Sequence, residues 1–350
     1  MLKNVVLNNF RNYTSREFDF EKGVNVICGD NAKGKTNILE ALYLISTGES
    51  FRARKIEEMV FFGEELGSVK GNIVVGSDDE PQEIVVIVNG GVVMGKKVNK
   101  RKYLINGVSK RRVDLVGIMP VVIFRPEDVE LITGSSEVRR RFVDGLLCQI
   151  EVQYQSSLST YEQALKRRNK VLDAIRDGLS NRYALTFWDN LLIKHGNYIT
   201  EKRRGLIDYI NDLFERSELF RKIKISYDFS AISESRLSQY KEAEVAVGYT
   251  LVGPHKDDFI VFDNDRNLSS FGSRGEQRMA VLAMKMGEIY YLEEKSKKNV
   301  LLLLDDIFSE LDEVHKNEVL RVTEKRQVVV TTADKSDAAL FKECKQILLN

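Results

Sequence analysis

The sequence predicts an α/β fold built around a phosphate-binding loop, with a mainly helical region inserted between two parts of the α/β core. Three observations carry this prediction. A glycine-framed loop of the pattern G-x-x-x-x-G-K-[ST] lies between a β-prone run and a helical run. A leucine-rich run, residues 300–304, ends in two aspartates. Between these motifs, residues 153–218 show helical spacing of apolar side chains and contain no proline.

The loop occupies residues 29–36. Residues 24–28 before it are β-prone, and the apolar residues among 37–45 recur at helical spacing, so a strand enters the loop and a helix leaves it. Backbone N–H groups at a helix N-terminus can bind a triphosphate without bringing a counter-charge. A chance glycine-rich turn is the alternative, but the order of strand, loop and helix favours nucleotide binding. The predicted nucleotide-binding residues are Gly29, Asp30, Asn31, Ala32, Lys33, Gly34, Lys35 and Thr36.

Four side chains are expected to carry the chemistry of this site. Lys35 would reach the β- and γ-phosphates of ATP, and the hydroxyl of Thr36 would bind Mg²⁺. Asp305 would hold the same Mg²⁺, directly or through water, and Asp306 would orient or deprotonate the attacking water. Two acids at a strand end can also simply begin a turn, but the phosphate loop favours the functional interpretation. The next core strand, residues 327–332, can end in a γ-phosphate sensor.

A second helix start with anion-binding features lies at residues 269–278. Ser273 is placed to cap the helix predicted over residues 279–293, and Gly275 lets an anion approach the exposed N–H groups. Ser273 followed three residues later by Glu276 is also an ordinary capping box. The spacing alone therefore does not choose between a ligand site and a cap.

The bulk composition excludes several classes. The 350 residues include 53 basic and 52 acidic ones, a formal net charge of +1, so any nucleic-acid or membrane site must be local. Three cysteines without a C-x-x-C and three scattered histidines argue against zinc and suit a reducing cytosol. The N-terminus does not fit a signal peptide, and the leucine run is far below membrane-spanning length. We expect a cytoplasmic protein with no membrane partner.

A local basic region covers residues 96–112, which hold eight basic and no acidic residues and bend at Asn106 and Gly107. A hairpin of this kind can neutralise phosphates of a nucleic-acid backbone. Lysines on an exposed strand edge also prevent aggregation, so both interpretations stay open, with the lack of acids favouring nucleic acid. The runs 166–168 and 202–204 can add to a DNA surface or be solvated helix faces.

The chain is predicted to divide into three segments. Residues 1–145 form the N-terminal part of the α/β core with an antiparallel β-layer, residues 146–245 form the helical arm, and residues 246–350 form the C-terminal part. A break at residues 178–181 predicts that two long helices fold back as a hairpin. Residues 250–258 form a tight loop before a strand, and their spacing suggests no chemical role.

Together these motifs resemble the ATP-binding-cassette ATPases, within them the heads of the SMC-like DNA-repair proteins, and most closely the RecF family. The resemblance covers essentially the whole chain. It is carried by residues 9–13, the phosphate loop with Asn31, and residues 124–128, 139–144, 253–258, 273–278 and 305–312.

The resemblance implies that residues 273–277 are the signature motif, which contacts the ATP held by the phosphate loop of a second subunit. ATP would then close a head-to-tail homodimer, with Lys35, Ser273 and Asp306 as its catalytic residues and residues 309–312 as the dimer-communication loop. The resemblance also implies binding to DNA at gaps or junctions and cooperation with RecO and RecR. It further implies a role in RecA loading during gap repair and the SOS response.

Several positions depart from the pattern of transporter cassettes. Asp306 stands where those proteins have the longer glutamate, so we expect slow ATP turnover suited to a timed switch. No histidine follows the last core strand, which leaves Thr331 or Thr332 as a weaker γ-phosphate sensor. Glu276 replaces the glutamine of many relatives, and residues 125–127 contain no glutamine for a Mg-linked loop.

Two other functions remain as alternatives to a DNA-binding ATPase switch. One is the energy-coupling subunit of a transporter, and the other is a structural SMC-type head. The helical region is too short for a long coiled coil, and its charged faces suit DNA better than a membrane partner.

Overall fold

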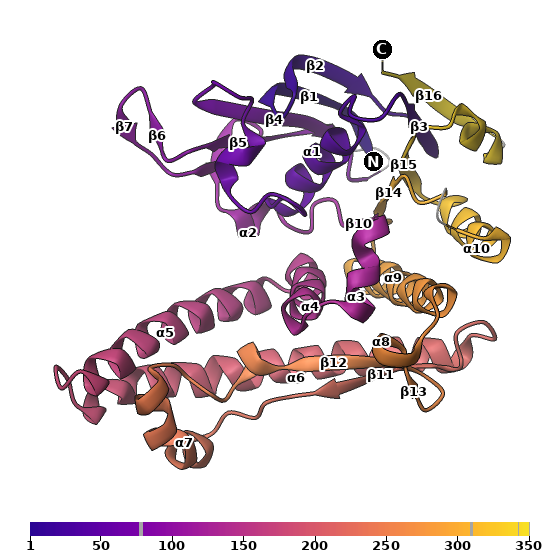
Figure 1. Ribbon diagram of the computed structural model, residues 1–350. Helices are drawn as coiled ribbons and strands as arrows, with labels where there is room; N and C mark the ends of the chain where they lie inside the picture. Colours follow the sequence, from indigo (N-terminus) through magenta and orange to yellow (C-terminus); the bar gives the residue numbers. More distant parts are fainter. Residues whose placement is uncertain (77–79, 309–310, 342, 350) are drawn as a thin grey trace. The chain divides into compact units, whose positions relative to one another are not determined.

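The computed structural model describes residues 1–76, 80–308, 311–341 and 343–349, and its ribbon is drawn in Figure 1. The chain forms two compact units: unit 1 is Met1–Asp128 with Leu292–Asn350, and unit 2 is Val129–Tyr291. These boundaries differ from the predicted segments 1–145, 146–245 and 246–350. The difference arises because helix α4 (Ser136–Ile150) and strand β12 (Asp258–Asp263) both pack with the helical arm.

Unit 1 contains a five-stranded sheet in the order β10-β14-β15-β3-β16, and every neighbouring pair is parallel. The carboxyl ends of all five strands therefore lie at one edge, which is where open α/β sheets bind ligands. The strands are β3 (Val24–Cys28), β10 (Val121–Phe124), β14 (Leu301–Asp305), β15 (Gln327–Thr332) and β16 (Cys344–Leu348).

A second, antiparallel sheet in unit 1 has the order β2-β1-β4-β5-β8-β9, and it confirms the predicted antiparallel layer. Asn106 and Gly107 connect β8 to β9 with positive φ angles of 49° and 76°, as a tight hairpin turn requires. Strands β6 (Val92–Val93) and β7 (Lys96–Lys97) form a separate small hairpin. The sheet consists of β1 (Leu2–Phe10), β2 (Tyr13–Asp19), β4 (Leu66–Ile73), β5 (Gln82–Asn89), β8 (Arg101–Ile105) and β9 (Val108–Lys110).

Helix α1 (Lys35–Thr47) packs against strands of both sheets and fills the core of unit 1. Its Ile38, Leu39, Leu42 and Ile45 are fully buried in one hydrophobic cluster with residues of β1, β4, β10 and β14. A helix covered on two sides needs apolar residues around most of its circumference, and this explains the apolar run after Thr36. The phosphate loop is thus held by a strand and a helix that are both fixed by the core.

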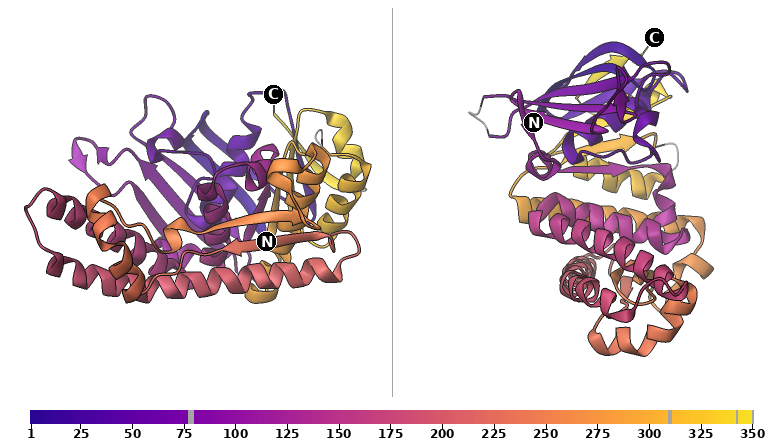
Figure 2. Two further views of the ribbon diagram at one scale, coloured as in Figure 1. Left: turned by 60° about the horizontal axis from the view of Figure 1, so that its bottom comes forward. Right: turned by 90° about the vertical axis from the view of Figure 1, so that its left-hand side faces the viewer.

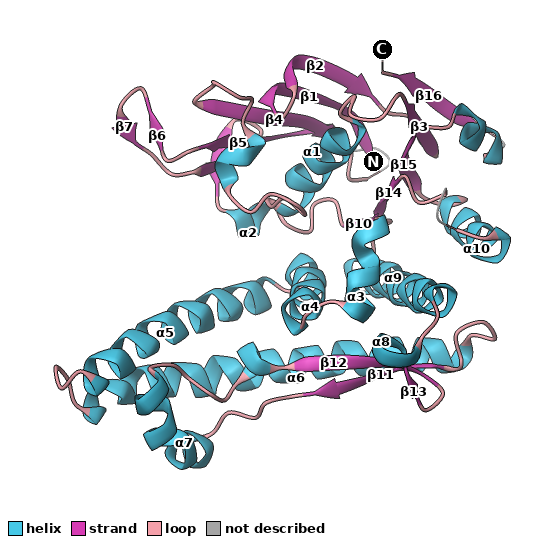
Figure 3. Ribbon diagram, viewed as in Figure 1, coloured by secondary structure: helices cyan, strands magenta, loops and turns pink. Residues whose placement is uncertain are grey.

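Unit 2 is organised around two long helices, α5 (Val152–Arg176) and α6 (Thr186–Arg216). They lie side by side, antiparallel, and the hairpin is seen in Figure 1 and in the left view of Figure 2. The predicted break at residues 178–181 is confirmed. Figure 3 shows the small sheet β11-β12-β13 beside α6. The other elements of this unit are α3 (Glu130–Thr133), η3 (Arg182–Leu185), β11 (Ile223–Asp228), α7 (Glu234–Val247), η4 (Pro254–Lys256), β13 (Arg266–Asn267) and α8 (Leu268–Phe271).

Helix α9 (Arg274–Ser296) carries the chain from unit 2 back into unit 1. Two elements were not predicted from the sequence: helix α10 (Glu313–Thr323) and strand β16, which pairs with β3 at the edge of the parallel sheet. Within the described residues, no helix combines the length and apolar character needed to cross a membrane. The short elements of unit 1 are η1 (Ile56–Met59), α2 (Arg112–Leu115), η2 (Pro126–Val129) and η5 (Lys335–Leu340).

Candidate functional site

The phosphate loop runs from the end of β3 to the first turn of α1. Gly34 caps α1 in the left-handed region at φ 95°. A Cβ there would meet the side chains of Asn12 and Tyr13 at 2.6–2.9 Å, so this position admits only glycine. Ala32 also has a positive φ, 67°. Asn31, Ala32 and Lys33 are exposed, which leaves the loop backbone open to a ligand.

Lys35 and Thr36 point into a cavity of about 210 Å³ at the mouth of the loop. The ammonium of Lys35 donates to the carbonyl oxygens of Gly29 (2.6 Å) and Asp30 (3.1 Å). This lysine is 8% exposed, so its charge is held by loop carbonyls at the position where a phosphate would bind. The cavity is lined by Asn31, Ala32, Gly34, Lys35, Thr36, Asn37, Arg52, Asp305 and Asp306.

Asp305 lies opposite Thr36 at the end of β14. Its Oδ1 accepts hydrogen bonds from the hydroxyls of Thr36 (3.0 Å) and Thr331 (2.6 Å). Burial raises the pKa of Asp305 above its ordinary value, and the negative charges of Glu127 and Asp306 also raise it. The hydrogen bonds from Thr331 and Thr36 lower this pKa and so oppose the shift. The structure thus brings together the two residues that the sequence analysis assigned to one metal ion, although they are 269 positions apart.

Asp306 follows directly, in the left-handed backbone region at φ 50°. Its N–H donates to the carbonyl of Thr331 (3.0 Å), and Asp306 is one of the residues that line the same cavity. Of the two predicted phosphate sensors, Thr331 bonds to Asp305, whereas Thr332 bonds within its own turn to Asp334 and Asp337. Thr331 is therefore the one that lies beside the cavity residues.

Helix α1 also carries a buried carboxylate, Glu40, that was not predicted from the sequence. The side chain of Glu40 is fully buried and receives two bonds from Arg11 (2.6 and 2.7 Å) and one from Arg52 (2.9 Å). Arg52 also contacts Asn37 and lines the phosphate-loop cavity. A buried carboxylate must be paired with cations, and both of its partners come from outside α1.

A larger cleft of about 710 Å³ adjoins this cavity and shares Asn37 and Arg52 with it. Its lining combines apolar groups, including Phe61 and Val92, with several carboxylates. The exposed ring of Phe62 stands at this cleft as well. The two hollows together offer room for a ligand longer than a phosphate group.

The predicted second anion site lies at the start of α9. Ser273 and Glu276 form the expected capping box: the Ser273 N–H donates to Glu276 Oε2 (2.7 Å), and the Glu276 N–H donates to Ser273 Oγ (3.3 Å). Gly275 is exposed, and a Cβ there would meet no described atom within 4 Å. These residues belong to unit 2, whereas the phosphate loop belongs to unit 1.

The predicted communication loop, residues 309–312, lies partly outside the described residues, since 309 and 310 are not described. Its last residue, Asp312, caps α10 by accepting from the His315 N–H at 3.0 Å.

The basic run 96–112 divides into two groups in the structure. Lys100, Arg101, Arg111 and Arg112 form ion pairs with neighbouring acids. The other four are exposed lysines, and no carboxylate among the described residues lies within ion-pair distance of them. They are Lys96, Lys97, Lys102 and Lys110.

Each of the two basic runs on the long helices, 166–168 and 202–204, contains one arginine that is buried inside unit 2. Arg168 is 2% exposed and pairs with Asp189 and Glu244. Arg203 is 3% exposed and pairs with two aspartates. Both guanidinium groups form ion pairs inside unit 2. The exposed residues of the two runs are therefore their sequence neighbours Lys166, Arg167 and Arg204.

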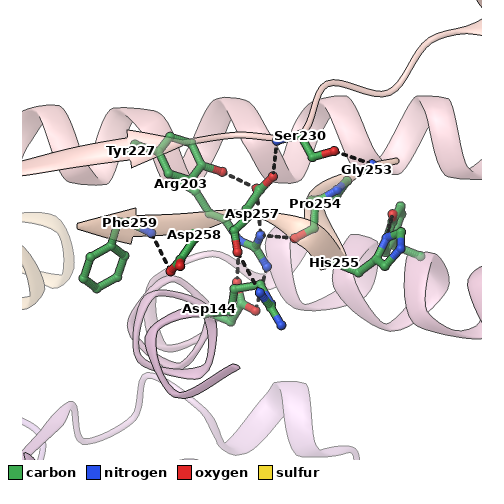
Figure 4. A network of polar contacts seen from close by, with 12 residues as sticks. Asp144, Arg203, Tyr227, Ser230, Gly253, Pro254, His255, Asp257, Asp258 and Phe259 are labelled. Carbon is green, nitrogen blue, oxygen red and sulfur yellow. Dashed lines mark hydrogen bonds and ion pairs between the residues drawn. The ribbon is translucent and has the colours of Figure 1, made fainter. Parts of the chain in front are cut away.

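The sequence suggested no role for the loop 250–258. In the structure its residues form hydrogen bonds and ion pairs with several elements of unit 2 (Figure 4). Asp257, 1% exposed, accepts from Arg203 (2.9 Å), Tyr227 and the Ser230 N–H. Arg203 also donates twice to Asp144 of α4, at 2.9 Å each. The loop turns at Gly253, φ 121°, where a Cβ would collide with the Tyr161 hydroxyl. A tight loop before β12 was predicted correctly, and its side chains tie α4, α6 and β11 to it.

A parallel sheet that presents a phosphate loop, an antiparallel sheet that shares its first helix, and an inserted helical hairpin together define an ATP-binding-cassette ATPase head of the SMC-like kind. The family model described as "RecF/RecN/SMC N terminal domain" matches residues 1–349. The chain belongs to this family and, within it, to the RecF proteins.

The chain is similar to "DNA replication and repair protein RecF" from Lachnospira eligens, with 37% identity over 347 residues, covering 95% of this chain and 92% of that protein. It is also similar to the protein of the same name from Agathobacter rectalis, with 33% identity over 340 residues, covering 95% and 91%. A solved structure described as "recombination mediator protein RecF-ATP in RecFOR pathway" matches with a TM-score of 0.86 and 31% identity, covering 99% of this chain and 95% of that one.

Proposed function

We propose that this protein is an ATP-dependent switch that dimerises on nucleotide and binds DNA during replication and repair. The observation that carries the proposal is the cavity where Lys35, Thr36 and Asp305 converge on the phosphate loop. The adjoining cleft supports ATP as the ligand, because it leaves space for a base and ribose beyond the phosphates. The similar RecF structure with ATP also supports this choice.

The residues at this cavity fit Mg²⁺. A hydroxyl and a carboxylate, Thr36 and Asp305, already bond to each other, and both are hard oxygen donors of the kind that Mg²⁺ takes. Among the described residues no cluster of three or more acidic, histidine or cysteine side chains forms a metal cage, which agrees with an ion held by one or two protein groups and substrate phosphates. When bound, Mg²⁺ supplies neutralisation of the charge that develops on the phosphates.

In this proposal each residue has a separate task. The loop N–H groups and Lys35 hold the phosphates. Asp306, aimed by its left-handed backbone at the same cavity, accepts the proton of the attacking water or orients it. The side chain of Asp306 is shorter than the glutamate found at this position in transporter cassettes, which supports slow ATP hydrolysis. In this proposal DNA stimulates the hydrolysis, and hydrolysis reopens the dimer after a delay.

The start of α9 supplies the dimer contact in this proposal. Ser273 and Gly275 of one subunit complete the nucleotide site of its twin, so that two nucleotides are enclosed in a head-to-tail homodimer. Their exposure supports this role, because Ser273 and Gly275 are both exposed at the start of α9 and a Cβ on Gly275 would meet no described atom within 4 Å.

DNA is the proposed polymer ligand, and its proposed contacts are Lys96, Lys97, Lys102 and Lys110, which are exposed and form no ion pair with a carboxylate among the described residues. Gapped or junction DNA is the proposed substrate, RecR the direct protein partner, and RecO and RecA partners further along the same pathway. The named relatives in repair and in the RecFOR pathway support these assignments. We place the protein in the cytoplasm.

Sedimentation tests the dimer model directly. Ser273→Arg should leave ATP affinity unchanged but keep the protein monomeric in saturating Mg-ATP. Ser270→Arg, at an exposed position of the neighbouring helix α8, is the matched control and should still dimerise. If the Ser273→Arg protein dimerises with ATP as the wild type does, the sandwich model is wrong.

A further inference from the structure

The chain contains the dipeptide Asn-Gly twice, in two different environments. Asn106 and Gly107 form the turn between β8 and β9, whereas Asn89 ends strand β5 and is followed by Gly90. In this dipeptide the backbone nitrogen of glycine, which has no side chain to shield it, can attack the side-chain amide carbon of asparagine. The product is a five-membered succinimide ring, and it forms only where the backbone can adopt the shape of that ring.

The β8–β9 turn can adopt this shape without breaking the hairpin. Asn106 and Gly107 both have positive φ, 49° and 76°, as in a type I′ turn. Rotating the peptide unit between them gives a type II′ turn, which also closes two-residue hairpins and leaves the φ of its first residue unchanged at a ψ of about −120°. At this ψ the glycine nitrogen lies on the side of Cβ, as the succinimide ring requires. Gly107 tolerates the change of sign in its own φ, because it has no Cβ.

The side chain of Asn106 is held at the atom that stays and is open at the atom that leaves. Its Oδ1 accepts the Glu83 N–H at 2.8 Å, and a donor at this place stabilises the negative charge that the oxygen gains when the amide carbon is attacked. The Nδ2 of Asn106, which leaves as ammonia, has no hydrogen-bond acceptor among the described residues. Asn106 and Gly107 are both exposed, so water reaches the ring.

Asn89 has the opposite surroundings. It is 4% exposed and pairs with Leu66 of β4, and its N–H donates to the Lys100 carbonyl at 3.0 Å. Its Nδ2 donates to the Asn99 carbonyl (2.9 Å), and its Oδ1 accepts from the Gly91 N–H (2.7 Å). Rotation of the backbone there would break hydrogen bonds on both sides of the strand. The same dipeptide should therefore be stable at this position.

We propose that Asn106 is a site of spontaneous deamidation and isoaspartate formation. The nitrogen of Gly107 loses its proton and bonds to the side-chain carbon of Asn106, and the bond from that carbon to Nδ2 breaks with release of ammonia. Water then opens the ring at either carbonyl, which gives aspartate or isoaspartate. In isoaspartate the backbone runs through the former side chain and is one atom longer, so it does not fit the two-residue turn that pairs Ile105 with Val108.

The modification places a carboxylate in the basic region. Residues 96–112 contain no acidic residue, and Lys102 and Lys110 lie on the two strands that the turn connects. This consequence rests on the proposed function, which assigns both lysines to DNA. A negative charge at the turn opposes the contacts of these lysines with phosphates. Deamidated protein should therefore bind DNA more weakly.

Peptide mapping by mass spectrometry tests the site. The full chain is incubated at mildly alkaline pH, once native and once unfolded in urea, and deamidation is followed at Asn106 and Asn89. In the native protein Asn106 should react at least tenfold faster than Asn89. In urea the two should react at similar rates, because their dipeptides are identical. The proposal is overturned if the native protein protects Asn106 as well as it protects Asn89, or if the difference in rate persists in urea.

DNA titration tests the consequence. Asn106→Asp should weaken DNA binding at least threefold and leave nucleotide affinity unchanged. The matched control is Asn264→Asp, which adds the same charge at an exposed residue of unit 2 with a φ of 51° and should bind DNA as the wild type does. Undiminished binding by Asn106→Asp would overturn the effect on DNA. Failure of the proposed function would instead appear as absent DNA binding by the unmodified wild type, with deamidation at Asn106 still detected.

Discussion

Replacing Arg203 with methionine removes the centre of the network around Asp257 while keeping most of the apolar volume. Arg203 bonds to Asp144, Asp257 and the carbonyl of Pro254, all at 2.7–2.9 Å. The substitution leaves the Asp257 carboxylate, 1% exposed, without its guanidinium partner. Asp144 is partly exposed and can be solvated, so the main cost falls on Asp257.

The expected cost is about 3–5 kcal/mol in the free energy of unfolding, as for other buried pairs that lose one partner. For a unit of this size, about 2–4 °C of melting temperature is lost per kcal/mol. We therefore expect a decrease of roughly 6–20 °C. The matched control is Arg141→Met on α4, which removes an exposed pair with Glu137 and should cost about 0–1 kcal/mol.

The loss should also depend on pH. Burial raises the pKa of Asp257 above its ordinary value, even though Tyr227, the Ser230 N–H and Arg203 favour the charged form. A raised pKa in the folded state means that the protonated form is the better tolerated one, so its stability contribution is present at low pH and is lost as pH rises through the folded pKa. Without Arg203 that pKa rises further. The difference between variant and wild type should therefore be largest near neutral pH and shrink as the pH falls.

Urea and thermal unfolding, followed by circular dichroism at several pH values, give both quantities. The reasoning is refuted if Arg203→Met costs no more than Arg141→Met, or if its cost does not fall as the pH is lowered from neutral. Nucleotide affinity serves as a separate readout, because the phosphate loop lies in unit 1. It should be retained below the melting temperature of the variant.

Three further predictions concern the site itself. Lys35→Met should abolish nucleotide binding in calorimetry and ATP-dependent dimerisation in sedimentation. Lys33→Met removes a charge from an exposed side chain of the same loop and should leave both intact. Equal loss in the two variants would show that nucleotide binding depends only on the total charge of the loop. Asp306→Asn should bind ATP but hydrolyse it at least tenfold more slowly, so that the dimer persists in sedimentation; a rate equal to that of the wild type would remove Asp306 as the base. Reversing Lys96, Lys97 and Lys102 to glutamate should weaken DNA binding and lower the salt slope by about 3, with nucleotide affinity unchanged. The comparison variant for this last test reverses Lys166 and Arg167, and a larger effect there would move the DNA surface to α5.

The sequence was sufficient for the elements whose signals are local. The order of strand, glycine loop and apolar helix predicted β3 and α1, and the proline-free helical run with one polar break predicted the α5–α6 hairpin. In each case the periodicity of apolar residues reports the burial of that same element. Strand β16 was missed because its alternation of buried and exposed residues is weak, and its pairing with β3 is decided by a partner more than 300 residues away.

The same reasoning separates the parts of the site that could be predicted from those that could not. Asp305 and Thr36 belong to motifs with recognisable spacing, so the sequence alone predicts that they meet. The Arg52–Glu40 contact has no motif, and a helical acid is usually solvated. Only the packing of α1 between two sheets shows that Glu40 is buried and that Arg52 must therefore turn towards the phosphate loop.

The division of the chain into units gives the proposed switch a physical basis. The residues of the phosphate loop and the predicted metal ligand Asp305 lie in unit 1. Ser273 and the network around Asp257 lie in unit 2. Substitutions in unit 2 should therefore separate nucleotide binding from dimerisation, which substitutions in the phosphate loop cannot do. A substitution at the start of α9 could abolish nucleotide binding as well as dimerisation. That result would mean that a single subunit does not bind ATP without its partner. Binding would then be cooperative in protein concentration, and a titration of ATP at two protein concentrations distinguishes these cases.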